Sequence, residues 1–479
     1  MNNIAEFLIN TANLYENKIA FTDKSGTVTY RELLIKTKKI AQWLTKNGIG
    51  QNDKVGIALY DSINLCAAFF ATVMLGAVAV MTNPRGRKEN LLKQLSFVGT
   101  DLVLIEGELI GAFDGAELKT ALIKDVAHES MSLTEYDQPI ATVKESIAFL
   151  LFTSGTTGSP MAVSWVHGTV IDAIKSRTSA LDLNSGDRVY CTGKIYSSYG
   201  MTSSMLGSVA NGGESFLESG LSTPMAVKTN ILNYKPNKFF SVPLIYNHFI
   251  NKKDENIPEM KCYSSGYHAS NEVTDGWRML TGGPLGITFG MTESLAFLCN
   301  NDGTNDLGFP MDGFEVRIAD DDDNEVADGV IGNLQCRSSI KGLNYYNRPI
   351  ETAKKFKEWM NSGDLAYRTS DGRFHYVNRA TDIITVNGQF VNPIDIEETI
   401  EKFPGIGQVA VVGKMGKNNI EQVEAYIVLD KGITIDTVGL KKWVISKHEK
   451  YACPRVYHIV DELPKTDNGK IQKYFLKNS

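Results

Sequence analysis

Apolar residues lie along much of the chain in short uninterrupted runs, at positions 55–60, 77–82, 102–105, 148–152 and 238–242. Strands that are buried on both faces of a sheet have this continuous apolar character. The runs alternate with segments of helical length, such as 30–47. This alternation predicts an α/β architecture in which parallel sheets are covered by helices.

One apolar stretch, at positions 65–81, approaches the length of a membrane span. Thr72 and Gly76 interrupt it, and its flanks carry no basic anchors. A buried helix that runs into a strand fits the stretch better, because the small residues near Gly76 allow a helix to approach a sheet closely. Asn83 and Pro84 then end the strand.

Short strands and turns are expected between 304 and 378, and the acidic stretch at 320–324 is interpreted as an exposed hairpin tip, with a metal site as the alternative. We place the main boundary near residue 379. This divides the chain into a large N-terminal domain, residues 1–379, and a small α+β C-terminal domain, residues 380–479.

The small domain is expected to contain a helix at 392–402, strands at 409–412 and 422–429, and a helix at about 437–447. The glycine pattern at 405–410 imitates a dinucleotide-binding fingerprint. It precedes a strand, whereas the fingerprint follows one, so we reject that interpretation.

Composition narrows the class of protein. A chain of 479 residues with 43% hydrophobic and 22% charged residues can bury large cores and is expected to form more than one domain. Its net charge of −6 argues against a general nucleic-acid or anionic-membrane surface. Six scattered cysteines indicate reduced core thiols, and the absence of a signal peptide at the start favours the cytoplasm.

A loop rich in hydroxyls and glycines follows the apolar run at 148–152. It comprises Thr153, Ser154, Gly155, Thr156, Thr157, Gly158 and Ser159. Glycines let backbone N–H groups turn inward and the hydroxyls add donors, an arrangement that can bind phosphates. No Gly-Lys pair is followed by Ser or Thr, which excludes a Walker-type loop. An ordinary polar turn is the alternative.

Seven short motifs appear in one order along the chain. They are Thr-Tyr-Arg-Glu-Leu at 29–33, Leu-Gly-Ala at 75–77 leading to Asn83-Pro84, the loop at 153–159, Gly-Met-Thr-Glu at 290–293, Ser-Gly-Asp at 362–364, Asn378-Arg379, and Pro-Lys-Thr-Asp-Asn-Gly-Lys at 464–470. In this series the chain resembles the adenylate-forming superfamily of acyl-CoA synthetases, aryl-acid ligases, luciferases and peptide-synthetase adenylation domains. The resemblance implies a large domain of α/β subdomains with a β-rich part, followed by a small mobile α+β domain.

The resemblance also assigns residues to ATP. Thr292 would lie beside the α-phosphate and Glu293 would hold Mg²⁺. Asp364 would accept hydrogen bonds from both ribose hydroxyls, and Arg379 would add positive charge nearby. The nucleotide site implied by the resemblance comprises Thr153, Ser154, Gly155, Thr156, Thr157, Gly158, Gly266, Tyr267, Phe289, Gly290, Asp364 and Arg379, with Phe289 facing the adenine. A turn aspartate and a helix-start acid are the structural alternatives for Asp364 and Glu293.

Lys470 would be the catalytic cation, reaching carboxylate and phosphate oxygens when the small domain takes one orientation. By the same resemblance Gly388 would line the route of a thiol and Thr381 would be the hinge. A solvated lysine in a basic tail is the alternative for Lys470. Two positions depart from the family pattern, because Met161 stands where a lysine is usual and Thr381 where Asp or Lys is usual.

Within the superfamily the chain looks most like benzoate-type CoA ligases. The acid pocket would comprise Ser197, Ser198, Tyr199, Gly200, Ser265 and Ala296, with ordinary packing as the alternative. Ser197 offers no counter-ion for a substrate ammonium, which disfavours α-amino acids. Ala296 replaces a histidine typical of benzoate ligases, and this allows a bulkier or substituted acid.

The expected activity is ATP-dependent conversion of an aryl or small hydrophobic carboxylic acid to an acyl-adenylate, with pyrophosphate release, and then transfer to the thiol of CoA. The protein would be an acid–thiol ligase that uses Mg²⁺, ATP and CoA. A stand-alone enzyme that loads the phosphopantetheine of an acyl carrier protein is the close alternative. A non-catalytic nucleotide-binding homologue and a luciferase-like oxidation are further alternatives, and the oligomeric state, a homodimer included, stays open.

Overall fold

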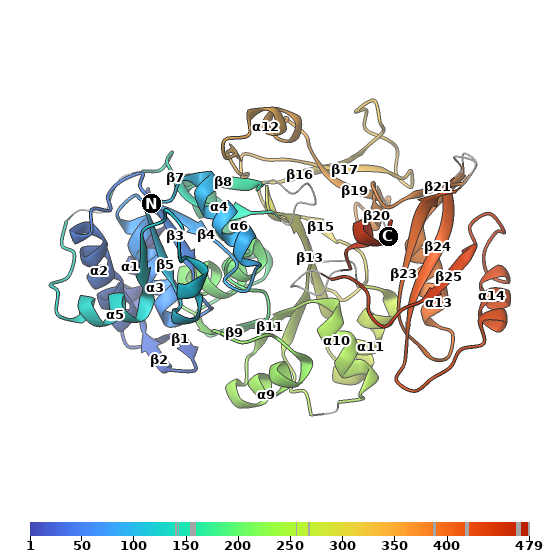
Figure 1. Cartoon of the computed structure of the whole chain (residues 1–479), viewed down its shortest axis with the longest axis horizontal. Coiled ribbons are helices and arrows are strands. Elements are labelled where there is room, and N and C mark those ends of the chain that lie inside the picture. Colours follow the sequence, from blue (N-terminus) through green and yellow to red (C-terminus); the bar gives the residue numbers. More distant parts are fainter. Residues whose placement is uncertain are drawn as a thin grey trace. The chain divides into compact units, whose positions relative to one another are not determined.

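The structure is a computed structural model that describes residues 1–138, 141, 143–153, 160–254, 256–266, 269–386, 389–416, 421–465 and 471–477. The chain forms two compact units. The first comprises Met1–Val316 and Cys336–Met360, and the second comprises Arg317–Gln335 and Asn361–Ser479. Each unit has its own sheets and core, and they are described separately (Figure 1).

The first unit contains a seven-stranded sheet in the order β18-β8-β7-β4-β3-β5-β6. Its strands are β3 (Lys54–Ala58), β4 (Val78–Met81), β5 (Leu102–Ile105), β6 (Thr120–Leu122), β7 (Ile147–Phe152), β8 (Ala162–Val166) and β18 (Asn344–Tyr345). Neighbouring strands from β7 to β6 are parallel, whereas β7–β8 and β8–β18 are antiparallel.

A nine-stranded sheet in the same unit has the order β15-β14-β13-β12-β11-β9-β10-β1-β2. Its strands are β1 (Ile19–Asp23), β2 (Gly26–Thr29), β9 (Arg188–Cys191), β10 (Glu214–Phe216), β11 (Lys238–Ser241), β12 (Lys261–Ser264), β13 (Leu285–Met291), β14 (Leu295–Asn300) and β15 (Phe309–Pro310). The central strands from β1 to β13 are parallel to their neighbours, and antiparallel pairs close both edges.

Helices cover these sheets. They are α1 (Ala5–Leu14), α2 (Tyr30–Lys46), α3 (Ile63–Met74), α4 (Lys88–Val98), η1 (Gly107–Ala112), α5 (Ile123–Met131), α6 (His167–Ala180), α7 (Ser198–Gly200), η2 (Met201–Leu206), α8 (Gly207–Asn211), α9 (Pro224–Tyr234), α10 (Pro243–Asn251), α11 (Asn271–Thr281) and α12 (Pro349–Lys355). Figure 1 shows α1, α2 and α5 grouped at the blue end of the unit.

The Thr-Tyr-Arg-Glu-Leu motif has a folding role. Thr29 caps α2, because its hydroxyl accepts a hydrogen bond from the Glu32 N–H while the Glu32 carboxylate accepts from the Thr29 N–H. The fully buried Tyr30 donates its hydroxyl hydrogen to the carbonyl of Gly213 at 2.5 Å. The motif therefore fixes the start of α2 against the loop before β10.

The second unit contains three small sheets. They are built from β16 (Glu315–Ala319), β17 (Gly332–Arg337), β19 (Met360–Arg368) and β20 (Phe374–Arg379); from β21 (Ile384–Val386) and β22 (Gln389–Val391); and from β23 (Ile406–Met415), β24 (Glu421–Leu429) and β25 (Val456–Ile459). Its helices are α13 (Pro393–Glu401), α14 (Thr437–Ile445) and α15 (Lys473–Lys477). A core of Val, Ile and Leu side chains lies between α13, α14 and the sheet of β23 and β24.

The α/β architecture with a large N-terminal and a small C-terminal part is confirmed. The stretch 65–81 is α3 followed by β4, and no helix among the described residues is long and apolar enough to cross a membrane. All of the glycine pattern at 405–410 except Gly405 lies within β23, whereas a dinucleotide-binding fingerprint follows a strand, and this agrees with its rejection. The second compact unit includes residues before 380. A division by contacts does not show which residues move as one body. The boundary of a mobile C-terminal domain at 379 therefore stays a prediction.

The acidic stretch 320–324 is an exposed turn between β16 and β17, where the Asp320 carboxylate accepts hydrogen bonds from the N–H groups of Asp322 and Asn324. No group of three or more potential metal ligands occurs among the described residues. All six cysteines are buried and reduced.

Candidate functional site

The parallel strands of the nine-stranded sheet have their carboxyl ends on the same side of the sheet. The residues predicted for the acid pocket lie at these ends. Strands β9, β11, β12 and β13 are consecutive parallel neighbours. Residues 197–200 follow β9, Ser265 follows β12, and Gly290 lies at the end of β13. Because ligands of α/β sheets bind beyond the carboxyl ends of the strands, a substrate is expected at this position.

The segment after β9 is held in a defined turn. The hydroxyl of Ser197 donates to the Lys194 carbonyl at 2.7 Å and accepts from the Gly200 N–H at 3.3 Å. A Cβ on Gly200 would lie 2.2 Å from the Lys194 carbonyl oxygen, so only glycine fits there. Both residues therefore shape the backbone at the predicted pocket.

The Tyr199 hydroxyl points at the carboxyl ends of two central strands. It donates to the carbonyls of Tyr263 at 3.0 Å and Ser241 at 3.3 Å, which are at the ends of β12 and β11. Ser265 is attached to one of these strand ends through its N–H and the Ser241 carbonyl. Ser198, on α7, and Ala296, on β14, are half-buried. These contacts bring Tyr199 and Ser265 together at one end of β11.

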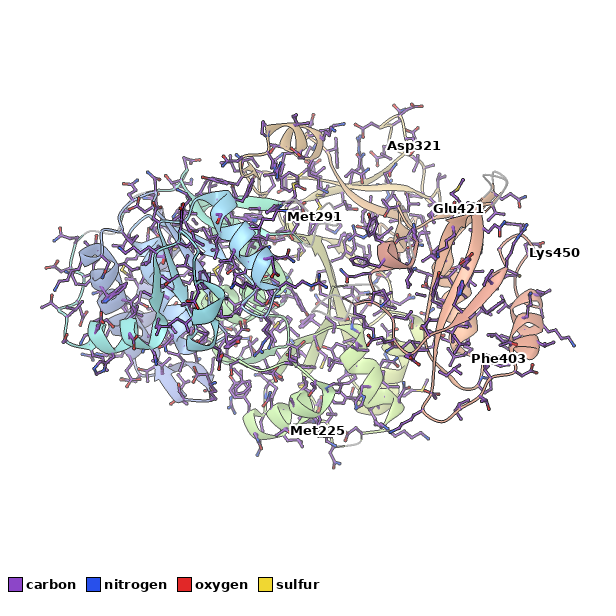
Figure 2. The ribbon with its side chains drawn as sticks, in the orientation of Figure 1. Met225, Met291, Asp321, Phe403, Glu421 and Lys450 are labelled. Carbon is purple, nitrogen blue, oxygen red and sulfur yellow. The ribbon has the colours of Figure 1, made fainter. Side chains whose placement is uncertain are left out.

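The predicted Thr-Glu pair lies in the tight turn between β13 and β14, next to Met291, which Figure 2 labels. A bulge interrupts the pairing after Phe289, and Leu295 adopts a left-handed φ of 56°. A Cβ on Gly290 would lie 1.7 Å from the Leu295 carbonyl oxygen. The hairpin that presents Thr292 and Glu293 thus requires glycine at position 290.

Replacing Gly290 by alanine is expected to lower activity by about 10–100-fold, because the hairpin must open and shift both side chains. It is also expected to cost about 1–3 kcal/mol of folding stability. Turnover and a thermal melt of the purified variant measure both effects. Gly283→Ala is the matched control, since its Cβ would meet only the Thr281 hydroxyl at 3.8 Å. Equal activity of the two variants would contradict the role given to Gly290.

Glu293 is buried, with 7% of its surface exposed, and is fixed from three sides. The Tyr345 hydroxyl donates to its carboxylate, and the Gly342 N–H donates to its carbonyl at 2.8 Å. The Trp165 indole donates to the carbonyl of Thr292 at 3.1 Å. Burial and the Glu293 charge raise the pKa of Tyr345, which keeps its hydroxyl protonated as a donor.

These anchors connect the Thr-Glu turn to the phosphate-loop hairpin. Trp165 lies on β8 and Tyr345 lies on β18, which pairs with β8. In the sequence, residues 154–159 connect β7 to β8, and the Thr153 N–H donates to the Met161 carbonyl at 2.9 Å. Strand β8 therefore carries the end of the predicted phosphate loop and supports Glu293.

Several predicted site residues lie outside the described residues: Ser154, Gly155, Thr156, Thr157, Gly158, Tyr267, Gly388 and Lys470. Their flanks are described. Lys465 and Ile471 form an antiparallel bridge, and the Gln472 N–H donates to the Pro464 carbonyl at 2.7 Å. The segment that bears Lys470 therefore begins and ends at one place in the second unit. Gly266 is exposed with a φ of 95°, and Phe289 packs edge-on against Phe297.

In the second unit, Asp364 and Arg379 are cross-strand partners on β19 and β20. The Arg379 Nε lies 2.9 Å from an Asp364 carboxylate oxygen, with 3% of the aspartate side chain and 40% of the arginine side chain exposed. The arginine therefore orients the buried carboxylate from the solvent side. Thr381 lies in the turn after β20, where its carbonyl accepts a hydrogen bond from Lys477.

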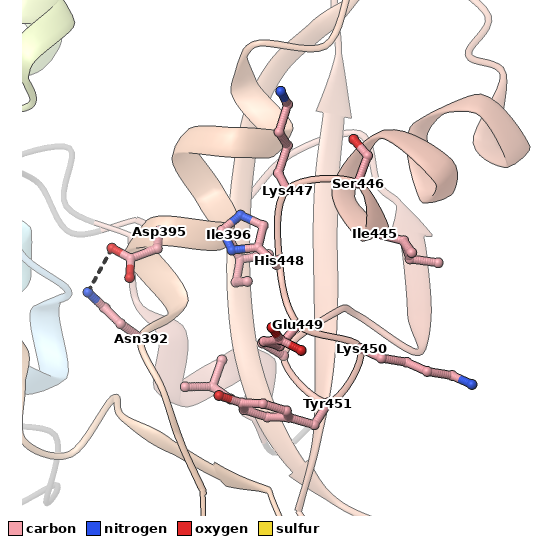
Figure 3. Close-up of a pocket in the computed structure, with 12 residues that line it drawn as sticks. Asn392, Asp395, Ile396, Ile445, Ser446, Lys447, His448, Glu449, Lys450 and Tyr451 are labelled. Carbon is pink, nitrogen blue, oxygen red and sulfur yellow. Dashed lines mark hydrogen bonds between the residues drawn. The ribbon is translucent and has the colours of Figure 1, made fainter.

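A hollow of about 690 Å³ lies in the second unit between α13 and the segment after α14 (Figure 3). Its lining includes Asp395, which accepts a hydrogen bond from Asn392, and residues 445–452. The Thr399 hydroxyl and the His448 Nε2 are 2.6 Å apart beside it. None of the residues predicted for ATP or the acid lines this hollow.

Glu293 is a suitable ligand for the expected Mg²⁺. A magnesium ion in a nucleotide site commonly takes one or two carboxylates and completes its shell with phosphates and water. One carboxylate oxygen of Glu293 already accepts the Tyr345 hydroxyl, which fixes the orientation of the group. When bound, the ion would neutralise phosphate charge.

A family model described as AMP-binding enzyme matches residues 8–346, and another described as AMP-binding enzyme C-terminal domain matches residues 395–470. The chain belongs to the AMP-binding enzyme family. This confirms the family resemblance identified in the sequence. The first match includes the loop predicted to bind phosphates, the Thr-Glu turn and Tyr345, and the second reaches Lys470.

Among AMP-binding enzymes, the chain is similar to aryl-acid CoA ligases. It is 28% identical to the 3-hydroxybenzoate–CoA ligase of Aromatoleum sp. (strain CIB), over 96% of this chain and 92% of the relative. It is 26% identical to the benzoate–CoA ligase of Thauera aromatica, over 96% and 93%. It is also 25% identical to a long-chain-fatty-acid–CoA ligase of Salmonella typhimurium, over 99% and 94%.

Solved structures share the fold. The anthranilate CoA ligase AuaEII in complex with anthranoyl-AMP has a TM-score of 0.92, with 23% identity over 99% of this chain and 96% of that one. A benzoate CoA ligase from Burkholderia xenovorans LB400 has a TM-score of 0.91, with 23% identity over the full length of both chains. These likenesses confirm the expected two-part fold.

Sequence reasoning missed Tyr345 and Trp165. Nothing in the short motifs marks either residue, because both act through contacts between strands that are distant in sequence.

Proposed function

We propose that this AMP-binding enzyme converts an aryl carboxylic acid and ATP to an acyl-adenylate and pyrophosphate, and then transfers the acyl group to the thiol of CoA. The relatives support this proposal because they align over nearly their whole length and are named as CoA ligases of benzoate and hydroxybenzoates. The AMP-binding family and the fold support ATP as the activating substrate.

One observation carries the proposal. Strand β8 follows the predicted phosphate loop and, through Trp165 and Tyr345, supports the turn that presents Thr292 and Glu293. The predicted acid pocket lies at the carboxyl ends of β9, β12 and β13, and β13 leads into that same turn. These contacts support a site in the first unit in which the acid would bind beside groups suited to an α-phosphate.

The chemistry assigns a task to each group. The acid carboxylate attacks the α-phosphate and pyrophosphate leaves, so the protein must align the reactants and neutralise negative charge. Thr292 would donate to α-phosphate oxygens, and Glu293 would hold the magnesium ion. Asp364, oriented by Arg379, would accept hydrogen bonds from the ribose hydroxyls. Lys470 would supply positive charge to both reacting groups.

Pyrophosphate exchange tests the first half-reaction without any acceptor. The enzyme is incubated with ATP, Mg²⁺, labelled pyrophosphate and, in turn, aryl, alkenoic and α-amino acids. We expect exchange with aryl acids and little with α-amino acids, because the pocket segment offers serine where an ammonium would need a carboxylate. Absence of acid-dependent exchange would contradict the proposal, and would favour a non-catalytic homologue.

The acceptor is tested by product mass. We expect an acyl-CoA when CoA is present. Acyl transfer that occurs only with a phosphopantetheinylated carrier protein would instead support the carrier-loading alternative, which the Ala-Cys-Pro sequence at 452–454 keeps open because CoA ligases often carry a lysine before this proline.

Met161 occupies the position where the family's phosphate loop usually ends in lysine. Replacing Met161 by lysine is expected to leave exchange equal or to raise it up to about tenfold, because a cation would be restored near the β- and γ-phosphates. The Met161 side chain is half-buried, and its carbonyl bond to Thr153 does not depend on the side chain. Met161→Gln, of similar length without charge, is the control. A collapse of exchange in the lysine variant alone would show that methionine has a positive role.

A further inference from the structure

A buried arginine lies beside Tyr199, one of the residues predicted for the acid pocket. Arg177, on α6, has 3% of its surface exposed. Its guanidinium carbon lies 5.8 Å from the centre of the Tyr199 ring. One Nη donates to the Ser203 hydroxyl at 2.7 Å, while its Nε is buried and has no hydrogen-bond partner within the described part of the chain. Arg177 is therefore next to the segment that carries the predicted acid pocket.

Among the described residues, no carboxylate forms an ion pair with Arg177. The charges that most affect the pKa of Arg177 belong to the phenols of Tyr199 and Tyr263 and the thiols of Cys191 and Cys299. Burial raises the pKa of Cys191 to about 12 and that of Cys299 to about 11, and it raises the pKa of both tyrosines, so all four groups are neutral.

The carboxylate on the same helix, that of Asp172, does not pair with Arg177. Asp172 lies on the exposed side of α6, where its carboxylate is 4.0 Å from the Lys175 ammonium. Burial lowers the pKa of Arg177, as expected for a cation without a carboxylate partner. An uncompensated buried charge is costly to a folded protein, and arginines in such surroundings are normally paired.

The helix that receives the Arg177 hydrogen bond is irregular. Ser203 lies in the π-helical turn η2, which continues directly from Ser198–Gly200. The hydroxyls of Thr202 and Ser204 donate to backbone carbonyls of the preceding turn, whereas the Ser203 hydroxyl accepts from Arg177. Single π-helical turns are frequent at ligand sites. The irregular turn therefore joins the predicted pocket residues to the guanidinium.

We propose that Arg177 is a specificity residue that binds a second carboxylate of the acid substrate, so that the preferred substrate is an aromatic dicarboxylic acid activated at the carboxyl group remote from Arg177. The inference rests on the proposed function. A guanidinium binds a carboxylate with two parallel hydrogen bonds, and the unsatisfied Nε is one of its donors. The absence of a histidine at Ala296 gives room for a substituted ring.

The test compares acids of the same shape and different charge. Pyrophosphate exchange is measured with phthalate, isophthalate and terephthalate, with their neutral carbamoylbenzoate counterparts, and with benzoate. We expect kcat/KM for one dicarboxylate to exceed that of its carbamoyl counterpart by at least about 100-fold. Arg177→Met is expected to lower this ratio by about the same factor. Arg31→Met, at an exposed arginine of α2, is expected to leave the ratio unchanged.

Arg177→Gln keeps a donor for Ser203 without the charge and replaces the methionine variant if that one does not fold. In the protein without substrate, either variant is expected to melt at or above the wild-type temperature, because a desolvated charge is removed. A wild type that uses benzoates but no dicarboxylate, or variants that keep the dicarboxylate preference, would overturn the inference and leave the proposed function intact. Lack of exchange with every acid would overturn the proposed function itself.

Discussion

Replacing Lys470 by alanine is expected to slow formation of the acyl-adenylate by about 10²–10³-fold, the effect typical of removing one charge-stabilising donor from an active site. Both reactants are anionic, and the lysine ammonium would reach the carboxylate and the phosphate together. The loss is expected in kcat more than in KM, since the interaction is strongest where charge develops. Pyrophosphate exchange measures this step.

Thioester formation from preformed acyl-adenylate and CoA is expected to change little in the Lys470 variant, because that step follows the loss of pyrophosphate. Lys465→Ala is the matched control in the same segment, where the Lys465 ammonium donates to the Gln408 side chain at 2.7 Å. If the alanine variant at 470 forms the adenylate at the wild-type rate, the lysine is a solvated residue of a basic tail and the assignment is wrong.

Replacing Glu293 by glutamine is expected to lower turnover by about 10²-fold and to raise the magnesium concentration needed for half-maximal exchange. The amide has the shape of the carboxylate and can still accept the Tyr345 hydroxyl, but it lacks the charge that Mg²⁺ prefers. Magnesium titrations of exchange in both proteins measure the effect.

Tyr345→Phe is the matched control for this variant. It keeps the charge of Glu293 and removes one hydrogen bond, so we expect a loss of only about 3–10-fold. An unchanged magnesium requirement in Glu293→Gln, or an equal loss in both variants, would contradict the role of Glu293 as the metal ligand.

Much of the fold could be predicted because the strands in the first unit are buried on both faces. The runs at 55–60 and 102–105 are β3 and β5, and the capping box at Thr29 marks the start of α2. Boundaries differ by one or two residues, as at 238–242, where β11 ends at Ser241 before Pro243 opens α10. The continuous apolar pattern identifies such strands, because both of their faces are covered in the fold.

The sequence predicts site residues only where a short motif contains them. The Thr-Glu turn and the loop after β7 have local signatures, whereas the support of Glu293 by Tyr345 joins residues 52 positions apart. The isolated guanidinium of Arg177 also depends on packing, since its neighbours Tyr199, Ser203 and Cys299 come from other elements. The hydrophobic periodicity of one segment does not show which side chains of other segments pack against it.

This AMP-binding enzyme is expected to make an acyl-adenylate as its first product. The mass of the nucleotide product shows this when the enzyme, ATP, Mg²⁺ and an aryl acid that supports exchange are mixed without a thiol. We expect acyl-AMP together with one equivalent of pyrophosphate. Formation of ADP and phosphate, or recovery of unchanged ATP with every acid, would contradict it.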